Sequence, residues 1–157
     1  MERHLTPSMG ESLKLLSGEK SIDFLKEIIY SDTQVAEEGV DLTVDKIYKI
    51  EEKGEIDFGG GERKDAELSE IKPALRNEDD DYGWWDLDSG TYLLEYNEEL
   101  EDEKNCIIQP LERLYRNSTT HPTIASKKIT KIPINVGKPG ISIKENSRVS
   151  KLVILED

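Results

Sequence analysis

The sequence has few cysteines and no long apolar stretches. Its single cysteine, Cys106, excludes a disulfide bond within the chain. The longest apolar runs, such as Cys106-Ile107-Ile108, fall far short of the roughly 20 residues of a membrane-spanning helix. The first residues contain no apolar stretch of the signal-peptide type. We therefore expect a cytoplasmic protein with no membrane partner.

Basic residues are also scarce, and those present are unevenly placed. The formal net charge is −13, which argues against nonspecific binding of DNA or RNA, so we expect no nucleic-acid partner. Residues 1–103 carry a net charge of −19, whereas residues 104–151 hold ten basic and two acidic residues, a net of +8. Two interpretations stay open. The basic segment holds a small polyanion such as a triphosphate, or it pairs with the acidic half within a chain or between subunits.

Hydrophobic alternation is typical of β-strands along most of the chain. Val40, Leu42 and Val44 alternate with polar residues, and Gly90 interrupts a second strand region. Short strands separated by turns predict an all-β sandwich or barrel. The predicted strand regions are 40–50, 84–96, 106–108, 129–136, 141–143 and 149–154.

Helical spacing occurs only near the N-terminus. Ile22, Leu25, Ile28 and Ile29 predict a short helix over 21–29 with Ser21 as its N-cap, and a helical turn at 13–16 is expected to end at Gly18. We therefore expect a helical N-terminal segment, residues 1–34, and a single β domain, residues 35–157.

Residues 51–81 are polar and rich in turn residues. Gly59-Gly60-Gly61 is not followed by Gly-Lys-Ser/Thr, so a hairpin tip is favoured over a phosphate loop. Asp79-Asp80-Asp81 is interpreted as a solvated loop.

Six short motifs lie in a fixed order along residues 35–154. Together they resemble the segments of the dCTP deaminase/dUTPase family, among them Gly-x-Asp-Leu, Arg-Ser-Ser-Leu-x-Arg, His-x-Thr, Asn-x-Gly-Lys and Arg-Ile-Ala-Gln-Leu. The motifs are Gly39-Val40-Asp41-Leu42, residues 90–96, residues 110–116, His121-Pro122-Thr123, residues 135–138 and residues 148–152.

The resemblance implies a dUTPase-like fold, a distorted barrel or jelly-roll-like β sandwich. It also implies a homotrimer with active sites between subunits, dUTP or dCTP as the ligand, and Mg²⁺ on the triphosphate. The deaminases of this family use no zinc. Because the chain has no Cys-x-x-Cys and only His4 and His121, we expect no zinc site here either.

The chain departs from the family at positions that carry chemistry. Leu111, Glu112 and Arg113 stand where the family has Arg-Ser-Ser, although Leu114 and Arg116 are retained. A carboxylate at position 112 would repel a phosphate unless Arg113 or a metal offsets it.

The family's general base is also replaced. Ile132 occupies the position of the deaminases' catalytic Glu, and no dUTPase-type Gly-x-Ile-Asp-x-x-Tyr segment lies between Thr123 and Asn135. An apolar side chain cannot accept a proton from water, so the ordinary mechanism of either enzyme lacks its base.

The resemblance and the chemistry together select the candidate site residues. Glu112 and Asp41 are candidate replacement bases, and Asp41 is also the candidate for an indirect contact with Mg²⁺. Three candidates have a structural alternative: a salt bridge between subunits for Arg116, a turn residue with a satisfied hydrogen bond for His121, and a turn or strand-end hydrogen bond for Asp41. The candidate nucleotide- or phosphate-binding residues are Arg113, Arg116, His121, Thr123 and Lys128, with Lys127 and Lys131 adding positive potential.

Three hypotheses about function follow. The first is a divergent enzyme acting on pyrimidine deoxynucleoside triphosphates, formally a dUTP pyrophosphatase or a dCTP deaminase. The second is a non-catalytic nucleotide sensor, and the third is a trimeric structural or interaction module on the same fold.

Overall fold

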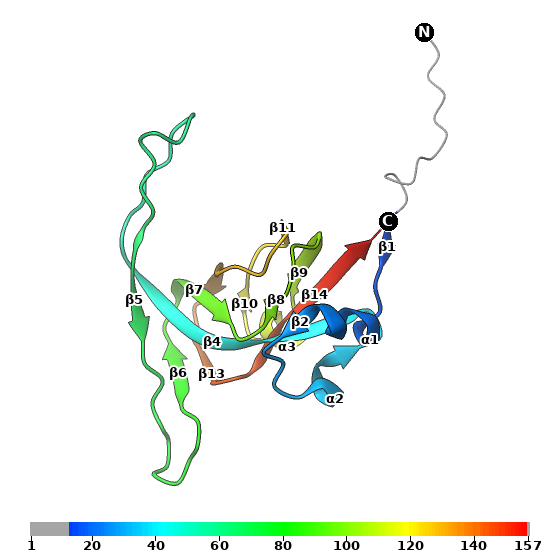
Figure 1. The fold of residues 1–157 in the computed structure, drawn as a ribbon. Helices are drawn as coiled ribbons and strands as arrows, with labels where there is room; N and C mark the ends of the chain where they lie inside the picture. The colour runs from blue at the N-terminus through cyan, green and yellow to red at the C-terminus, as the bar shows by residue number, and fades with distance from the viewer. Residues whose placement is uncertain (1–12, 157) are drawn as a thin grey trace.

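The computed structural model describes residues 13–156, and its main feature is a curled antiparallel sheet (Figure 1). The main path of the sheet runs β10-β12-β7-β4-β14-β9-β11, with β1, β3 and β5 paired beside it. Two further strand pairs, β13 with β6 and β2 with β8, complete the fold, so the prediction of an all-β protein is confirmed. In chain order the elements are β1 (Lys14–Leu15), α1 (Gly18–Ser21), η2 (Ile22–Phe24), β2 (Leu25–Lys26), α2 (Ser31–Gln34), β3 (Val35–Ala36), β4 (Gly39–Glu52), β5 (Glu67–Ile71), β6 (Trp84–Leu87), β7 (Gly90–Tyr96), β8 (Glu99–Leu100), β9 (Cys106–Pro110), α3 (Glu112–Tyr115), β10 (Thr119–Thr120), β11 (Ile124–Ser126), β12 (Ile132–Val136), β13 (Ile141–Lys144) and β14 (Arg148–Glu156).

β4 is the longest strand and links the two halves of the sheet. Its first half pairs with β14 and β3, and its second half pairs with β7 and β5. The register against β7 shifts between Val44 and Lys46. A bulge of this kind turns the strand, and it lets Val44 and Ile47 both lie in the core although they are three residues apart.

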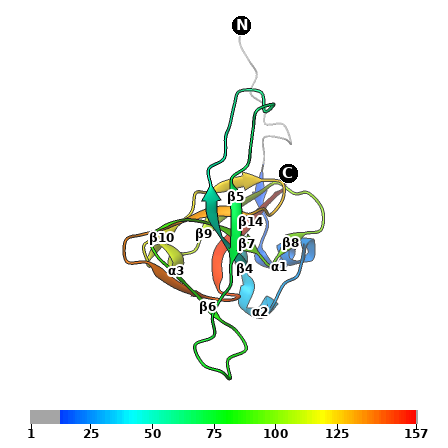
Figure 2. The same cartoon turned by 90° about the vertical axis from the view of Figure 1, so that its left-hand side faces the viewer.

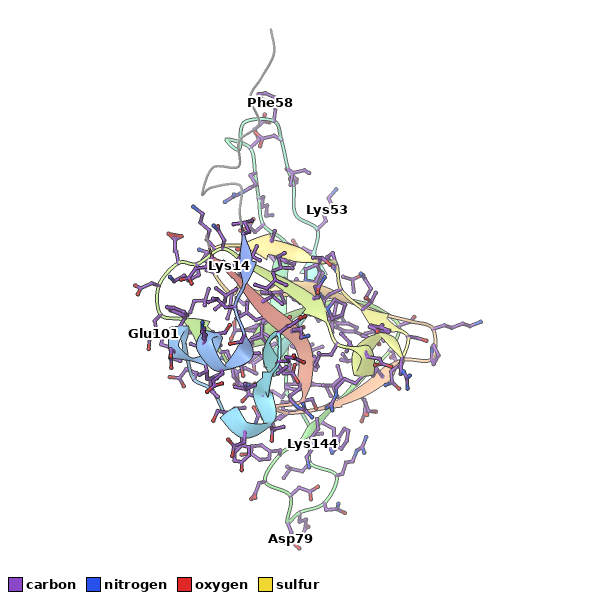
Figure 3. The ribbon with its side chains drawn as sticks, turned by 90° about the vertical axis from the view of Figure 1, so that its right-hand side faces the viewer. Lys14, Lys53, Phe58, Asp79, Glu101 and Lys144 are labelled. Atoms are coloured by element: carbon purple, nitrogen blue, oxygen red, sulfur yellow. The ribbon has the colours of Figure 1, made fainter. Side chains whose placement is uncertain are left out.

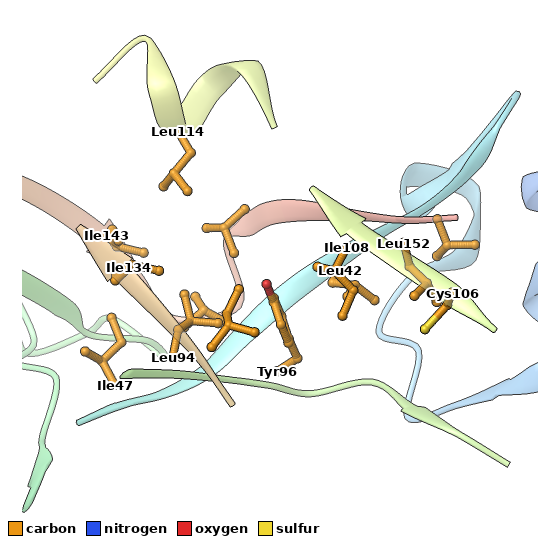
Figure 4. Packing of buried hydrophobic residues seen from close by; sticks show 14 of the residues in the cluster. Leu42, Ile47, Leu94, Tyr96, Cys106, Ile108, Leu114, Ile134, Ile143 and Leu152 are labelled. Atoms are coloured by element: carbon orange, nitrogen blue, oxygen red, sulfur yellow. The ribbon is translucent and has the colours of Figure 1, made fainter. Parts of the chain in front are cut away.

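The core fills the space inside the curl of the sheet (Figure 4). Its side chains come mainly from the central strands, and Leu114 of α3 closes it on one side. Leu42, Ile108 and Leu152 are fully buried, as the alternating pattern of their strands requires. The strands predicted at 40–50, 84–96, 106–108, 141–143 and 149–154 are confirmed, and the region predicted at 129–136 is a strand from residue 132 onward.

The N-terminal helix predictions are wrong in position. α1 begins at Gly18, which was expected to end a helical turn, and Oγ of the N-cap Ser17 accepts from the Lys20 amide at 3.2 Å. The chain leaves the helical conformation at Leu25, which is buried and pairs with Leu100 of β8. Pairing with β8 buries Leu25, and this tertiary contact outweighs the helical spacing of the apolar residues in 22–29.

The turn expected at 13–16 is also absent. Lys14 and Leu15 instead form β1, paired with the end of β14. Residues 1–12 of the expected helical segment, with His4, lie outside the described residues.

The polar segment 51–81 contains a strand that was not predicted, β5. Residues 51–66, the last two of β4 and the connection to β5, form an arm that extends away from the body, and the β5–β6 loop extends on the opposite side (Figure 2). None of the helices in residues 13–156 has the length and apolar character needed to cross a membrane.

Candidate functional site

A hollow lies where α3 meets the strands β4 and β14. It gathers four of the predicted site residues, although they come from distant parts of the sequence. The residues that line it are Asp41, Leu111, Glu112, Arg113, Arg116 and Arg148.

The position of α3 explains why its charged residues face this hollow. The Leu111 amide donates to the Val149 carbonyl at 2.9 Å, which ties the start of α3 to β14. Leu114 is buried in the core at 2% exposure, so a single turn of helix directs its neighbours outward. Glu112, Arg113 and Arg116 are accordingly exposed.

An ion pair between β4 and β14 forms one wall. Nη1 of Arg148 lies 2.9 Å from Oδ2 of Asp41, and it also donates to the Thr33 carbonyl at 3.4 Å. The side chains are only 11% exposed for Asp41 and 29% for Arg148. Asp41 therefore joins two strands through Arg148, in keeping with its structural alternative. Sequence reasoning did not select Arg148 as a site residue, although it begins the last of the six motifs.

A second ion pair lies across α3. Nη2 of Arg116 is 2.6 Å from Oε1 of Glu112, one helical turn apart, and both side chains are more than half exposed. The carboxylate at position 112 is thus paired with Arg116, whereas the sequence had suggested Arg113 or a metal as the group that could offset it. The pair also places the partner of Arg116 within its own chain. Among the ion pairs of residues 13–156, none involves Arg113.

A larger groove adjoins this hollow and shares Arg113 and Arg148 with it. The groove runs between the β6–β13 pair and α3, and its volume of about 770 Å³ is within the range of small-molecule sites. The hollow itself carries three guanidinium groups and two carboxylates, and the groove adds the carboxylates of Asp86 and Asp88. The three guanidinium groups gathered at the hollow suit an anion larger than a single phosphate.

His121 lies elsewhere, in the interior. Its exposure is 3%, and its Nε2 is 2.8 Å from Oγ of Ser150, which is 2.5 Å from the hydroxyl of Tyr96. Nδ1 lies 2.8 Å from the Pro122 carbonyl, which can only accept, so Nδ1 carries the proton and Nε2 accepts from Ser150. Burial lowers the pKa of His121 and keeps it neutral. His121 is thus an interior residue whose two ring nitrogens both have hydrogen-bond partners.

The remaining predicted residues do not join the hollow. Thr123 and Lys128 are exposed beside β11 and are not among the lining residues. Ile132 is 1% exposed and shares the inward face of β12 with Ile134 and Val136. Position 132, which the resemblance aligns with the deaminases' catalytic Glu, therefore faces the core.

A buried carboxylate under β4 was not anticipated. Glu98 is 1% exposed and accepts from the Thr43 amide at 2.8 Å, from the Thr43 hydroxyl at 2.5 Å and from Nε2 of Gln34 at 2.8 Å. Burial raises the pKa of Glu98, and these hydrogen bonds partly offset the increase. Gln34 also accepts from the amides of Ile29 and Tyr30, which holds the loop whose Thr33 carbonyl meets Arg148. In the sequence, Glu98 lies in a polar run that carries no sign of burial.

The residues that line the hollow do not form a preformed metal site. Within residues 13–156, no group of three or more His, Cys, Asp or Glu side chains is arranged to hold a metal ion. Mg²⁺ commonly uses one or two carboxylates together with substrate phosphates. Glu112 and Asp41 are the carboxylates of the hollow that could stand beside an ion in that form.

Comparison with known proteins gives consistent results from sequence and fold. No family model matches the chain. The chain is 27% identical over 153 residues to a probable deoxyuridine 5'-triphosphate nucleotidohydrolase of Methanosarcina mazei and 29% identical to that of Methanosarcina acetivorans. Each alignment covers 93% of this chain and 85% of the relative.

A solved structure shares the fold. The 2'-deoxycytidine 5'-triphosphate deaminase of Agrobacterium tumefaciens superposes with a TM-score of 0.60 at 17% identity, over 91% of this chain and 46% of that protein. The chain thus spans about half the length of the deaminase. The expectation of a dUTPase-like β fold is confirmed.

Proposed function

Since this chain is a divergent member of the dUTPase/dCTP deaminase-like family, we propose that its arginine-lined hollow binds a pyrimidine deoxynucleoside triphosphate, dUTP or dCTP. One observation carries the proposal. Arg113, Arg116 and Arg148 come from the two family motifs at 110–116 and 148–152, and they meet around one depression.

The ion pairs indicate how a triphosphate would be held. Arg113 is outside the ion pairs described and is the first donor for a phosphate. Arg116 is held by Glu112 in an exposed pair, and such pairs contribute only about 0–1 kcal/mol. A triphosphate can therefore compete with Glu112 for Arg116. Arg148 is less exposed and remains bound to Asp41.

Mg²⁺ belongs to the proposal as a companion of the ligand. When bound to the phosphates it neutralises part of their charge, and it would bring the ligand within reach of Glu112 and Asp41 despite their negative charge. Glu112, and the Asp41 oxygen that is not bound to Arg148, would then hold the ion. The homotrimer implied by the resemblance and the cytoplasmic location expected from the sequence are proposed with it.

Binding is better supported than turnover. Both carboxylates of the hollow are in ion pairs, and position 132 is an inward-facing isoleucine. A water molecule would need one of these carboxylates released before it could lose a proton to it. We therefore propose a nucleotide-binding protein first, with dUTP pyrophosphatase or dCTP deaminase activity as the second candidate.

The test is a thermal-shift titration with dUTP, dCTP, dUMP and dTTP in the presence of Mg²⁺, with products read by chromatography. A ligand that binds only the folded state raises Tm. Arg113→Ala should weaken binding about tenfold or more, since a hydrogen bond to a charged group contributes roughly 1.5–3 kcal/mol. Lys20→Ala, an exposed change on α1, is the control.

Three outcomes are distinguishable. Stabilisation without product supports the sensor, and stabilisation with product supports the enzyme. The absence of any shift at millimolar ligand overturns the proposal and leaves the structural module.

A further inference from the structure

The arm of residues 51–66 ends in two apolar side chains that nothing in the described chain covers. Ile56 is 91% exposed and Phe58 is 109% exposed, and Phe58 lies at the end of the hairpin farthest from the body (Figure 3). Single exposed apolar residues are ordinary, but two large ones together at the end of a projection mark an interaction site.

The tip is built in a defined conformation. Asp57, between the two apolar residues, accepts from the Gly60 amide at 2.7 Å and from the Glu62 amide at 2.8 Å. Gly60 adopts a φ of 95°, which a side chain would disfavour. The polar residue of the tip thus closes the turn and leaves Ile56 and Phe58 directed outward.

The stem of the arm is also specified. The amides and carbonyls of Glu55 and Lys64 exchange hydrogen bonds of 2.6 and 2.9 Å across the hairpin. A Cβ atom on Gly54 would lie 2.7 Å from the Lys64 carbonyl oxygen, so the close approach of the two sides requires glycine. An isolated two-stranded hairpin is only marginally stable in water, which favours an arm that packs on another surface.

Charge indicates what that surface is. Residues 51–66 carry six acidic and three basic residues, a net charge of −3, whereas residues 124–131 carry three lysines and no acid. Lys131 pairs with Glu95 of its own chain at 3.6 Å, so Lys127 and Lys128 supply the positive charge that faces outward. Lys127 and Lys128 of the latter segment are exposed, and they follow β11, the last strand of the sheet order. The chain therefore presents an acidic arm and a basic surface to which a second copy's arm is complementary.

We propose that the arm of one copy docks onto the β11 surface, residues 124–131, of a second copy, with Ile56 and Phe58 as its apolar anchors. The contact joins two different surfaces, so it is head-to-tail and closes into a ring if the rotation between copies permits. It rests on the proposed self-association and not on nucleotide binding, so the two proposals can fail separately.

The first test is the molar mass in solution of the full chain and of the variant carrying Ile56→Ser and Phe58→Ser. Loss of the two anchors should weaken self-association by about tenfold or more, as truncation of central apolar anchors does. The matched control changes Leu75→Ser and Tyr82→Ser in the β5–β6 loop, where both residues are about half exposed. That loop extends on the opposite side of the body, with Asp79 at its end (Figure 3). The control should keep the wild-type mass.

A complementation experiment tests the head-to-tail geometry. A receiver variant, Lys127→Glu with Lys128→Glu, should also lose mass, and wild-type assembly should weaken with added salt. Mixing the arm variant with the receiver variant leaves one intact arm and one intact surface, so a one-to-one complex should form.

A wild-type chain that stays monomeric, or an arm variant that keeps the wild-type mass, overturns the proposal. An arm variant that loses mass, but whose mixture with the receiver variant forms no complex, overturns the head-to-tail contact. Because the tip residues are almost fully exposed, the variant should keep the circular dichroism spectrum of the wild type, which separates a lost contact from a lost fold.

Discussion

Asp41 on β4 and Arg148 on β14 form an ion pair of 2.9 Å at the wall of the arginine-lined hollow, although 107 residues separate them in the chain. The β14 register against β4 shifts between Arg148 and Ser150. This irregularity sets Arg148 opposite Thr43 and leaves its guanidinium free to turn back toward Asp41.

Asp41→Asn should destabilise the fold by about 1–3 kcal/mol. This loss lies between the cost of breaking an exposed ion pair and that of breaking a buried one. The pair is largely shielded, and the change leaves Arg148 without its counter-charge. Urea denaturation measures the loss. Combining it with Arg148→Gln should give less than the sum of the two single changes, and strict additivity would mean that the two residues are not coupled.

Glu112→Gln should change stability by less than about 1 kcal/mol, because its pair with Arg116 is exposed. Without Mg²⁺ it should nevertheless tighten triphosphate binding severalfold, since it removes a carboxylate from the hollow and releases Arg116. With Mg²⁺ it should weaken binding, since Glu112 is proposed to stand beside the ion. Isothermal titration calorimetry with dUTP and dCTP measures the effect. If Glu112 is the replacement base, the same change abolishes any turnover, and weaker binding would show that Glu112 acts through bound Mg²⁺.

Glu98 should make stability depend on pH in the acidic range. Burial raises its pKa above the usual 4.5, so the folded state binds the proton more tightly than the unfolded chain. Its contribution is full below pH 4.5 and declines as the pH rises through the folded pKa. Glu98→Gln brings an amide donor next to Nε2 of Gln34 and should be destabilising at every pH, but the deficit should shrink as the pH rises.

That comparison requires urea denaturation of both proteins from about pH 4 to pH 7, a range that starts near the unfolded pKa of Glu. Glu99→Gln, an exposed neighbour on β8, is the control and should follow the wild type. A deficit for Glu98→Gln that is constant with pH would mean that the two states of the chain bind the Glu98 proton equally.

His121 should act in the opposite direction at slightly higher pH. Burial lowers its pKa below 6.5, so the unfolded chain binds the proton more readily. The stability that depends on neutral His121 is present above pH 6.5 and is lost as the pH falls through the folded pKa. His121→Gln should lack this loss, whereas His4→Gln should retain it. Equal pH profiles for the wild type and His121→Gln would contradict the buried, neutral assignment.

The strands could be predicted because their signal is local. Alternation of Val40, Leu42 and Val44 follows directly from side chains that point to opposite faces of a strand. The order of the motifs likewise identified the family before any coordinates. The same reasoning failed at 21–29, because helical spacing does not reveal that Leu25 pairs with Leu100 or that Gln34 binds the amides of Ile29 and Tyr30.

The sequence by itself determined the all-β class and the likeness to the dUTPase/dCTP deaminase-like family, whereas the loss of a general base at Ile132 and the residues that hold a phosphate stay predictions. Only the tertiary structure decided which of those residues meet. It brought Asp41, Glu112, Arg113 and Arg116 together with Arg148, withdrew His121 into the interior, buried Glu98, and set Ile56 and Phe58 on an exposed arm. The physical reason is that strand register, bulges and burial couple segments far apart in the chain, so the partner and the exposure of a charged side chain are not properties of its local sequence.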